Sequence, residues 1–181
     1  GALAGPFPGR VPADSQGTMN SILLGGDGWV SYETVGGGQG GRPVGVADEP
    51  LPGMSGVHTA MTNTLNTPIE AAERVLPVRV RRYTLRRGSG GAGRSPGGEG
   101  IERELEVLEP VTVSLICDRR VVAPRGRAGG GDGAVGENWL LPGGDTSRAE
   151  RLPDKCTIAL QAGDVLRILT PGGAAWGPTS S

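Results

Sequence analysis

The sequence is poor in aromatic residues, lysine, histidine and cysteine. Phe, Trp and Tyr make up 3% of its 181 residues, and the chain has one lysine, one histidine and two cysteines. Few aromatic side chains leave little for nucleic-acid bases to stack on. No stretch approaches the roughly 18 consecutive apolar residues of a membrane-spanning helix. These absences argue against nucleic-acid binding and against a membrane partner.

The two cysteines, Cys117 and Cys156, lack CxxC spacing and fall in predicted strands. Cysteines of this kind behave as small buried hydrophobes. The first ten residues show no charged segment followed by an apolar run, as a secretory signal would. We therefore expect reduced thiols and a cytoplasmic location.

Charge is nearly balanced overall but unevenly placed. The net charge is −1, yet residues 74–98 contain seven arginines and no acid. Such a stretch by itself suggests a nucleic-acid patch. The next predicted strand, however, carries three carboxylates: Glu102, Glu104 and Glu106. A hairpin would set Arg79, Arg81 or Arg86 opposite these acids, where each cross-strand pair contributes about 0.2–1 kcal/mol, and we favour this pairing.

Glycine and proline are abundant but clustered. The chain has 34 glycines and 15 prolines. The glycines gather in four clusters: 36–41, 88–100, 126–136 and 172–177. Stretches of alternating apolar residues lie between them, which indicates strands joined by long glycine-rich loops.

Six strands are predicted, at 78–87, 101–108, 111–117, 138–141, 157–160 and 165–169. In the first, the apolar phase slips between Val80 and Tyr83, as at a β-bulge. The second and third are expected to form a hairpin, as are the last two, and the apolar run at 111–117 suits a strand buried on both faces. The predicted class is mainly β, an antiparallel sandwich or barrel.

One short helix is predicted near residues 68–75. Thr67 suits the N-cap, Pro68 the first helical position, and Glu70 would complete a capping box. Pro77 ends the helix because the residue before a proline is pushed out of the helical region.

The segment 53–70 (GMSGVHTAMTNTLNTPIE) concentrates polar groups and contains the one histidine. A buried polar group without a partner costs roughly 1–3 kcal/mol, so water or a ligand must satisfy these residues. His58 is the natural residue for acid-base work or metal ligation, although it also suits a structural bond to a loop carbonyl. The amides and hydroxyls of Thr62, Asn63, Thr64 and Asn66 suit a small polar ring with N–H and C=O groups, or else turns of their own loop. No second His, Cys pair or acidic cluster lies beside His58, so no metal site is assigned.

Several collinear motifs carry a family resemblance. SQGTMN (15–20), YETVGGGQGGRP (32–43) and SGVHTAMTNTLNTPIE (55–70) are followed by RYTLRRGSGGAGRSPGGEGIERE (82–104), VTVSLICDRR (111–120), RGRAGGGDGAVGENWLL (125–141) and TPGGAAWG (170–177). In this order they resemble the C-terminal part of the B-type subunit of ATP-dependent hydantoinases and 5-oxoprolinases. One departure is Ala60, where relatives often have a second histidine, and this departure argues against local metal binding.

The resemblance implies a domain organisation. Residues 1–56 are expected to belong to a larger domain truncated at Gly1, residues 57–177 to form a mainly-β C-terminal domain, and residues 178–181 to be a disordered tail.

The resemblance also implies a function. This chain would be part of a hydrolase that opens cyclic amides such as hydantoin, N-methylhydantoin or 5-oxoproline, with His58, Thr62 and Asn63 as catalytic candidates. Further candidates for substrate binding are Thr64, Asn66, Gln16, Thr18, Asn20 and Arg42. The last of these follows a glycine loop, where its planar fork suits a carboxylate or phosphoryl group.

ATP is expected on a partner. The one lysine, Lys155, follows no glycine loop, so no P-loop is present. The resemblance implies ATP and Mg on an A-type partner subunit, further B-type copies, and a possible divalent metal in the missing N-terminal part. Two alternatives stay open: a non-catalytic assembly module, or a subunit of an acetophenone carboxylase-like enzyme.

Overall fold

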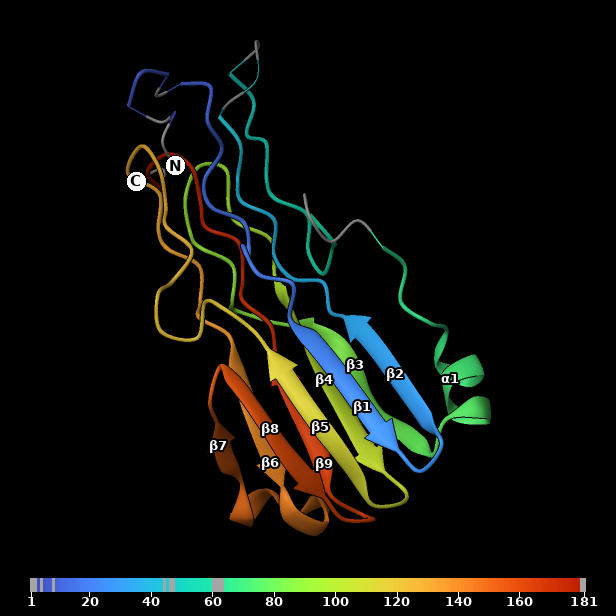
Figure 1. The fold of residues 1–181 in the computed structure, drawn as a ribbon. Coiled ribbons are helices and arrows are strands. Elements are labelled where there is room, and N and C mark those ends of the chain that lie inside the picture. Colours follow the sequence, from blue (N-terminus) through green and yellow to red (C-terminus); the bar gives the residue numbers. More distant parts are fainter. Residues whose placement is uncertain are drawn as a thin grey trace.

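The computed structural model describes residues 3, 5–7, 9–43, 45, 48–59 and 64–179. Figure 1 shows two packed layers of antiparallel strands and, above them, a bundle of extended segments. The front sheet has the order β2-β1-β5-β8 and the back sheet the order β3-β4-β9-β6-β7. The predicted mainly-β sandwich is confirmed, and the barrel alternative is not observed among the described residues.

The front sheet consists of β1 (Ser21–Gly26), β2 (Trp29–Thr34), β5 (Val111–Ile116) and β8 (Lys155–Leu160). The back sheet consists of β3 (Val78–Arg86), β4 (Gly100–Val107), β6 (Glu137–Leu141), β7 (Glu150–Leu152) and β9 (Val165–Leu169). The helices are α1 (Ile69–Val75) and two 3₁₀ turns, η3 (Pro142–Gly144) and η4 (Thr146–Arg148). No helix among the residues described has the length and apolar character needed to cross a membrane.

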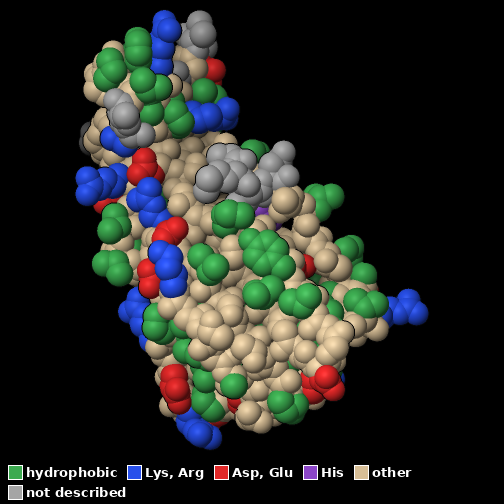
Figure 2. Space-filling view, viewed as in Figure 1, with side chains coloured by type: hydrophobic (Ala, Val, Ile, Leu, Met, Phe, Trp, Pro, Cys, Tyr) green, Lys and Arg blue, Asp and Glu red, His purple; other side chains and the backbone are tan. Residues whose placement is uncertain are grey.

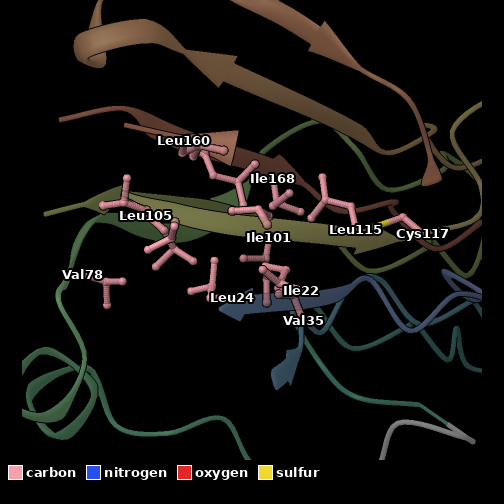
Figure 3. Packing of buried hydrophobic residues seen from close by; sticks show 14 residues of the cluster. Ile22, Leu24, Val35, Val78, Ile101, Leu105, Leu115, Cys117, Leu160 and Ile168 are labelled. Atoms are coloured by element: carbon pink, nitrogen blue, oxygen red, sulfur yellow. The ribbon is translucent and has the colours of Figure 1, made fainter. Parts of the chain in front are cut away.

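The core lies between the sheets, where alternate side chains of each strand meet. Its buried members include Ile22 and Leu24 of β1, Leu105 of β4, Leu115 of β5 and Ile168 of β9. Figure 3 shows these side chains gathered between the layers. Two-residue alternation therefore places one face of every strand in the core.

The predicted hairpin between 78–87 and 101–108 is confirmed. β3 pairs with β4, with a register shift between Val80 and Arg82 where the bulge was expected. Arg79 and Arg81 both pair with Glu106, at 3.4 and 3.1 Å. Arg86 instead reaches across to Glu137 of β6, at 2.7 Å. The basic stretch is thus largely neutralised within the back sheet.

The other two predicted hairpins are wrong. β4 and β5 lie in different sheets, as do β8 and β9. The connections at 108–110 and 161–164 carry the chain from one layer to the other. Each strand has its own apolar face, and two such faces are both buried when the strands oppose each other across the core.

The strand at 111–116 is not buried on both faces as predicted. Thr112 is exposed and Ile116 is 60% exposed, so only one side of β5 faces the core. Cys117 follows the end of the strand and is fully buried.

The predicted helix is confirmed, but its capping box is wrong. Pro68 is the N-cap residue, and no side chain caps the helix. The Thr67 N–H donates instead to the Glu33 carboxylate of β2, at 3.1 Å. Glu33, which is distant in the sequence, therefore accepts the hydrogen bond that the capping box assigned to Glu70.

β7 has no counterpart among the predicted strands, and neither do β1 and β2. β1 and β2 are joined at Asp27 and Gly28, an Asp-Gly pair that is a strong hairpin signal. β1 also pairs with β5, so residues 21–34 share a sheet with residues 111–116 and 155–160. The division into 1–56, 57–177 and 178–181 stays a prediction, and residues 180 and 181 lie outside the described part of the chain.

The glycine clusters form a bundle of extended segments, which we call the glycine bundle: residues 36–41, 88–100, 126–136 and 171–177. Neighbouring segments bond through their backbones; for example, Gly98 N–H donates to Gln39 O and Gly173 N–H to Gly98 O, both at 2.8 Å. A β-carbon added at Gly38 would lie 2.0 Å from Gly173 N and 2.1 Å from Gly98 O. Glycine is therefore needed because three backbones approach too closely for any side chain.

Candidate functional site

Asn66 is the centre of a polar cluster at the junction of β2, β3 and the loop before α1. Its Nδ2 donates to the Thr34 carbonyl, at 2.6 Å, so its Oδ1 must be the acceptor of the amide. That Oδ1 accepts from the Tyr83 hydroxyl at 3.3 Å and lies 3.1 Å from His58 Nε2. His58 Nε2 is thus the donor, and the other nitrogen of the neutral ring, Nδ1, is left as a proton acceptor.

His58 Nδ1 is buried and has no hydrogen-bond partner among the described residues. A buried acceptor without a partner is unfavourable by about 1–3 kcal/mol. This nitrogen is therefore suited to take a proton or to accept a hydrogen bond from a bound ligand.

A surface cavity of about 210 Å³ adjoins the cluster. Its walls are residues 32–34 of β2 and residues 64–67 of the loop, with Met19 beside them. The Thr64 and Thr34 hydroxyls lie 3.2 Å apart, and the Tyr32 hydroxyl lies 3.0 Å from Ser21 Oγ. The cavity is smaller than the roughly 300–1,000 Å³ pockets that hold drug-sized ligands, and so suits a small polar molecule.

A buried ion pair underlies the cavity. Glu33 of β2 and Arg103 of β4 meet across the sandwich at 2.6 Å, with side chains 16% and 5% exposed. The Arg103 guanidinium also lies 5.3 Å from the centre of the Tyr83 ring. Burial raises the pKa of Tyr83, against the opposing effect of the Arg103 charge, so the phenol stays protonated and donates to Asn66.

The structure brings three of the predicted site residues together: His58, Thr64 and Asn66. Two predicted catalytic residues, Thr62 and Asn63, lie outside the described residues. Their roles stay predictions.

Gln16, Thr18 and Asn20 form a separate, buried network, in which Gln16 Nε2 has no hydrogen-bond partner among the described residues. All three are at most 5% exposed. Asn20 Nδ2 donates to Gln16 Oε1 at 2.7 Å, and Thr18 Oγ1 accepts from Asp118 N–H at 2.8 Å. Asn20 Oδ1 accepts from Arg120, a buried arginine whose pKa is lowered by burial. These residues join the start of β1 to the segment after β5, and their predicted contact with substrate stays untested.

Arg42 is exposed, and its backbone forms an isolated bridge with Leu51. It does not line the cavity. Its predicted binding role also stays untested.

The predicted set lacks several members of the site, among them Tyr83, Glu33 and Arg103. One signal was present, because Arg103 shares a strand face with Ile101, Leu105 and Val107. A charge on an apolar face of a strand calls for a buried partner. That partner is 70 residues away in sequence, and only tertiary pairing identifies it.

The part of the chain that the structure describes contains no group of three or more His, Cys, Asp or Glu residues able to hold a metal. Both cysteines are free thiols.

Known proteins resemble this chain in sequence and in fold. The sequence matches the family Hydantoinase B/oxoprolinase over residues 1–179. It is 44% identical to 5-oxoprolinase 1 of Arabidopsis thaliana, covering 91% of this chain and 12% of that protein. An uncharacterized protein of Methanocaldococcus jannaschii is 45% identical, with 97% of this chain and 30% of that protein covered.

The crystal structure of an ATP-dependent caprolactamase from Pseudomonas jessenii has a similar fold. Its TM-score is 0.76 at 23% identity, over 98% of this chain and 32% of that one. The chain thus spans less than a third of the length of each of these proteins.

Proposed function

Since the chain belongs to the hydantoinase B/oxoprolinase family, we propose that it is the C-terminal part of the B-type subunit of an ATP-dependent cyclic amide hydrolase. The substrate proposed is hydantoin, N-methylhydantoin or 5-oxoproline. The observation that carries this proposal is the Asn66 cluster: Asn66 lines the 210 Å³ cavity, and its amide contacts both His58 and Tyr83, neither of which is itself a wall residue. The relative named 5-oxoprolinase supports the reaction class.

The described residues suit a cyclic amide, which presents an N–H donor next to a carbonyl acceptor. The Thr64 hydroxyl both donates and accepts, and the Tyr32 hydroxyl lies in the same cavity wall. We assign His58 Nδ1 the role of proton acceptor. Asn66 is assigned the role of holding the His58 imidazole in place through its contact with Nε2. Thr62 and Asn63 are proposed to complete the catalytic set, and Arg42, Gln16, Thr18 and Asn20 to serve binding.

ATP and Mg are proposed to act on a partner A-type subunit, in a complex with further B-type copies. An unstrained amide resists hydrolysis. Transfer of the terminal phosphoryl group of ATP to the carbonyl oxygen, with release of ADP, would make the carbonyl carbon more reactive toward water. Any divalent metal is proposed to bind in the part of the subunit that precedes this region. The free thiols Cys117 and Cys156 agree with the proposed cytoplasmic location.

Alanine substitution in the complete complex tests the proposal. His58→Ala and Asn66→Ala are expected to lower turnover at least tenfold, about 1.4 kcal/mol, with assembly intact. Arg148→Ala, at an exposed position of η4, is the matched control and should leave turnover unchanged.

Unchanged turnover in both variants would favour the second candidate, a non-catalytic assembly module. The observation behind that candidate is the buried network of Gln16, Thr18 and Asn20, whose side-chain oxygens all accept hydrogen bonds from within the protein. Bicarbonate-dependent consumption of a ketone, in place of amide hydrolysis, would identify the acetophenone carboxylase-like alternative.

A further inference from the structure

The outer face of the front sheet is almost free of charge. Strand register aligns its outward residues in three rows: Val30–Gly25–Thr112–Ala159, Tyr32–Leu23–Ser114–Thr157 and Thr34–Ser21–Ile116–Lys155. Thr34 and Ser21, at one end of the third row, are buried, and the exposed surface is formed by the other residues. The one charged residue in these rows is Lys155, which lies at a corner and pairs with Asp118 at 3.0 Å. Figure 2 shows hydrophobic side chains over this sheet, with charged ones mainly at its rim. We call this surface the neutral face.

The outer face of the back sheet has the opposite character. Arg167 pairs with Glu104 at 2.6 Å, and the pairs of Arg79 and Arg81 with Glu106 lie on the same side. Soluble domains commonly carry about 25–35% charged residues on their surfaces. The back sheet thus has a surface suited to water, whereas the neutral face does not.

Removing water from the neutral face costs little free energy, because its exposed side chains are largely apolar and its hydroxyl groups bond to one another. Val30 is 69% exposed, Ile116 60% and Tyr32 56%. The hydroxyls between them bond to one another, since Ser114 Oγ lies 2.8 Å from Thr157 Oγ1 and Ser21 Oγ lies 3.0 Å from the Tyr32 hydroxyl. Covering these groups leaves few polar atoms without a partner. Exposed apolar patches of this kind mark interaction sites, and the surface that fits is itself apolar and uncharged.

We propose that the neutral face is the docking surface for the remainder of the B-type subunit. The proposal rests on the proposed function, in which this region is part of a longer subunit. This fold covers 32% of the caprolactamase chain, so about two thirds of a subunit of that length lies outside the fold and is available to pack against it. Tyr32 belongs both to the neutral face and to the wall of the 210 Å³ cavity. The docked part therefore also covers the mouth of the candidate site and completes it.

Cysteine labelling in the complete B-type subunit tests this proposal. In a Cys156→Ser background, Thr112→Cys and Thr157→Cys each place one thiol on the neutral face. Thr84→Cys, an equally exposed threonine on the outer side of β3, is the matched control. Maleimide is expected to label the two neutral-face thiols at least tenfold more slowly than the control in the native subunit, and at the same rate after unfolding.

Equal native rates at all three positions would overturn the proposal. Protection that is lost on dilution, as the subunit dissociates into single copies, would identify a second copy as the occupant and would equally overturn it. Protection seen only after the A-type subunit is added would identify that subunit as the occupant, and this result too would overturn the proposal. Labelling needs no turnover, so failure here is distinct from failure of the His58 and Asn66 test.

Discussion

The ion pair between Glu33 and Arg103 allows the energetics of the candidate site to be tested directly. Arg103 Nη1 lies 2.6 Å from Glu33 Oε2, but neither Nη1 nor Nε of Arg103 makes an aligned hydrogen bond to any residue described. Arg103→Met keeps an unbranched apolar stem, removes the guanidinium and leaves the Glu33 carboxylate buried without a countercharge. Breaking a buried pair in this way costs about 3–5 kcal/mol. Because Glu33 is 16% exposed, we expect the lower end, about 3 kcal/mol.

Removing both charges should restore most of that loss. Glu33→Gln by itself leaves the Arg103 guanidinium unpaired and is expected to cost about as much. The double variant Glu33→Gln/Arg103→Met buries no charge, and the carbonyl oxygen of the introduced amide can still accept from Thr67 N–H. Replacing a poorly aligned buried pair by neutral groups is often neutral or stabilising, so the double variant should lose less than either single variant.

Equilibrium urea unfolding, followed by tryptophan fluorescence, measures these free energies. A loss of about 3 kcal/mol corresponds to a fall in Tm of about 6–12 °C for a chain of this size. Arg79→Met is the control, since Arg79 is 61% exposed in its pair with Glu106 and should cost under about 1 kcal/mol. A double variant that loses the sum of the two single losses would refute this account of the pair. So would an Arg103→Met variant that costs no more than Arg79→Met.

Three further predictions concern the glycine bundle, one loop and the thiols. Gly38→Ala, which would put a β-carbon 2.0 Å from a neighbouring backbone, should lower the free energy of unfolding by about 1–3 kcal/mol or more. Gly25→Ala, with its nearest atom at 4.0 Å, should change thermal stability by less than about 1 kcal/mol. Burial would raise the pKa of Glu99, but hydrogen bonds from Ser89, Gly90 and Gly88 outweigh it and lower that pKa. In urea unfolding between about pH 3 and pH 7, the advantage of the wild type over Glu99→Gln should therefore be full above the unfolded pKa and vanish as pH falls through the lower folded pKa; a pH-independent difference would contradict this. Burial raises the pKa of both thiols, but Cys117 is fully buried, so a thiol reagent should modify Cys156 in the native protein and Cys117 only after unfolding.

The positions of β3, β4, β5, β6, β8 and β9 followed from alternation along the chain because the period of a strand is a local property, whereas β1, β2 and β7 were missed. The hairpin of β3 and β4, its bulge and its arginine–glutamate pairs were all visible in the order of residues 78–107. The pairing of β4 and β5 was not, since a short turn can join strands within one sheet or between two. Whether the two strands pair in one sheet or lie in two sheets depends on which arrangement buries both apolar faces. That arrangement depends on the packing of all the strands in the sandwich.

The sequence by itself determined the mainly-β class, the glycine-rich connections, the family resemblance and the polar loop that contains His58 and Asn66. Only the tertiary structure decided that Asn66 orients His58 together with Tyr83, and that Arg103 pairs with Glu33 across the core. It also showed that uncharged side chains from four strands form one face. The physical reason is distance along the chain: alternation and turn chemistry act over a few residues, whereas these contacts join residues that lie far apart in the sequence.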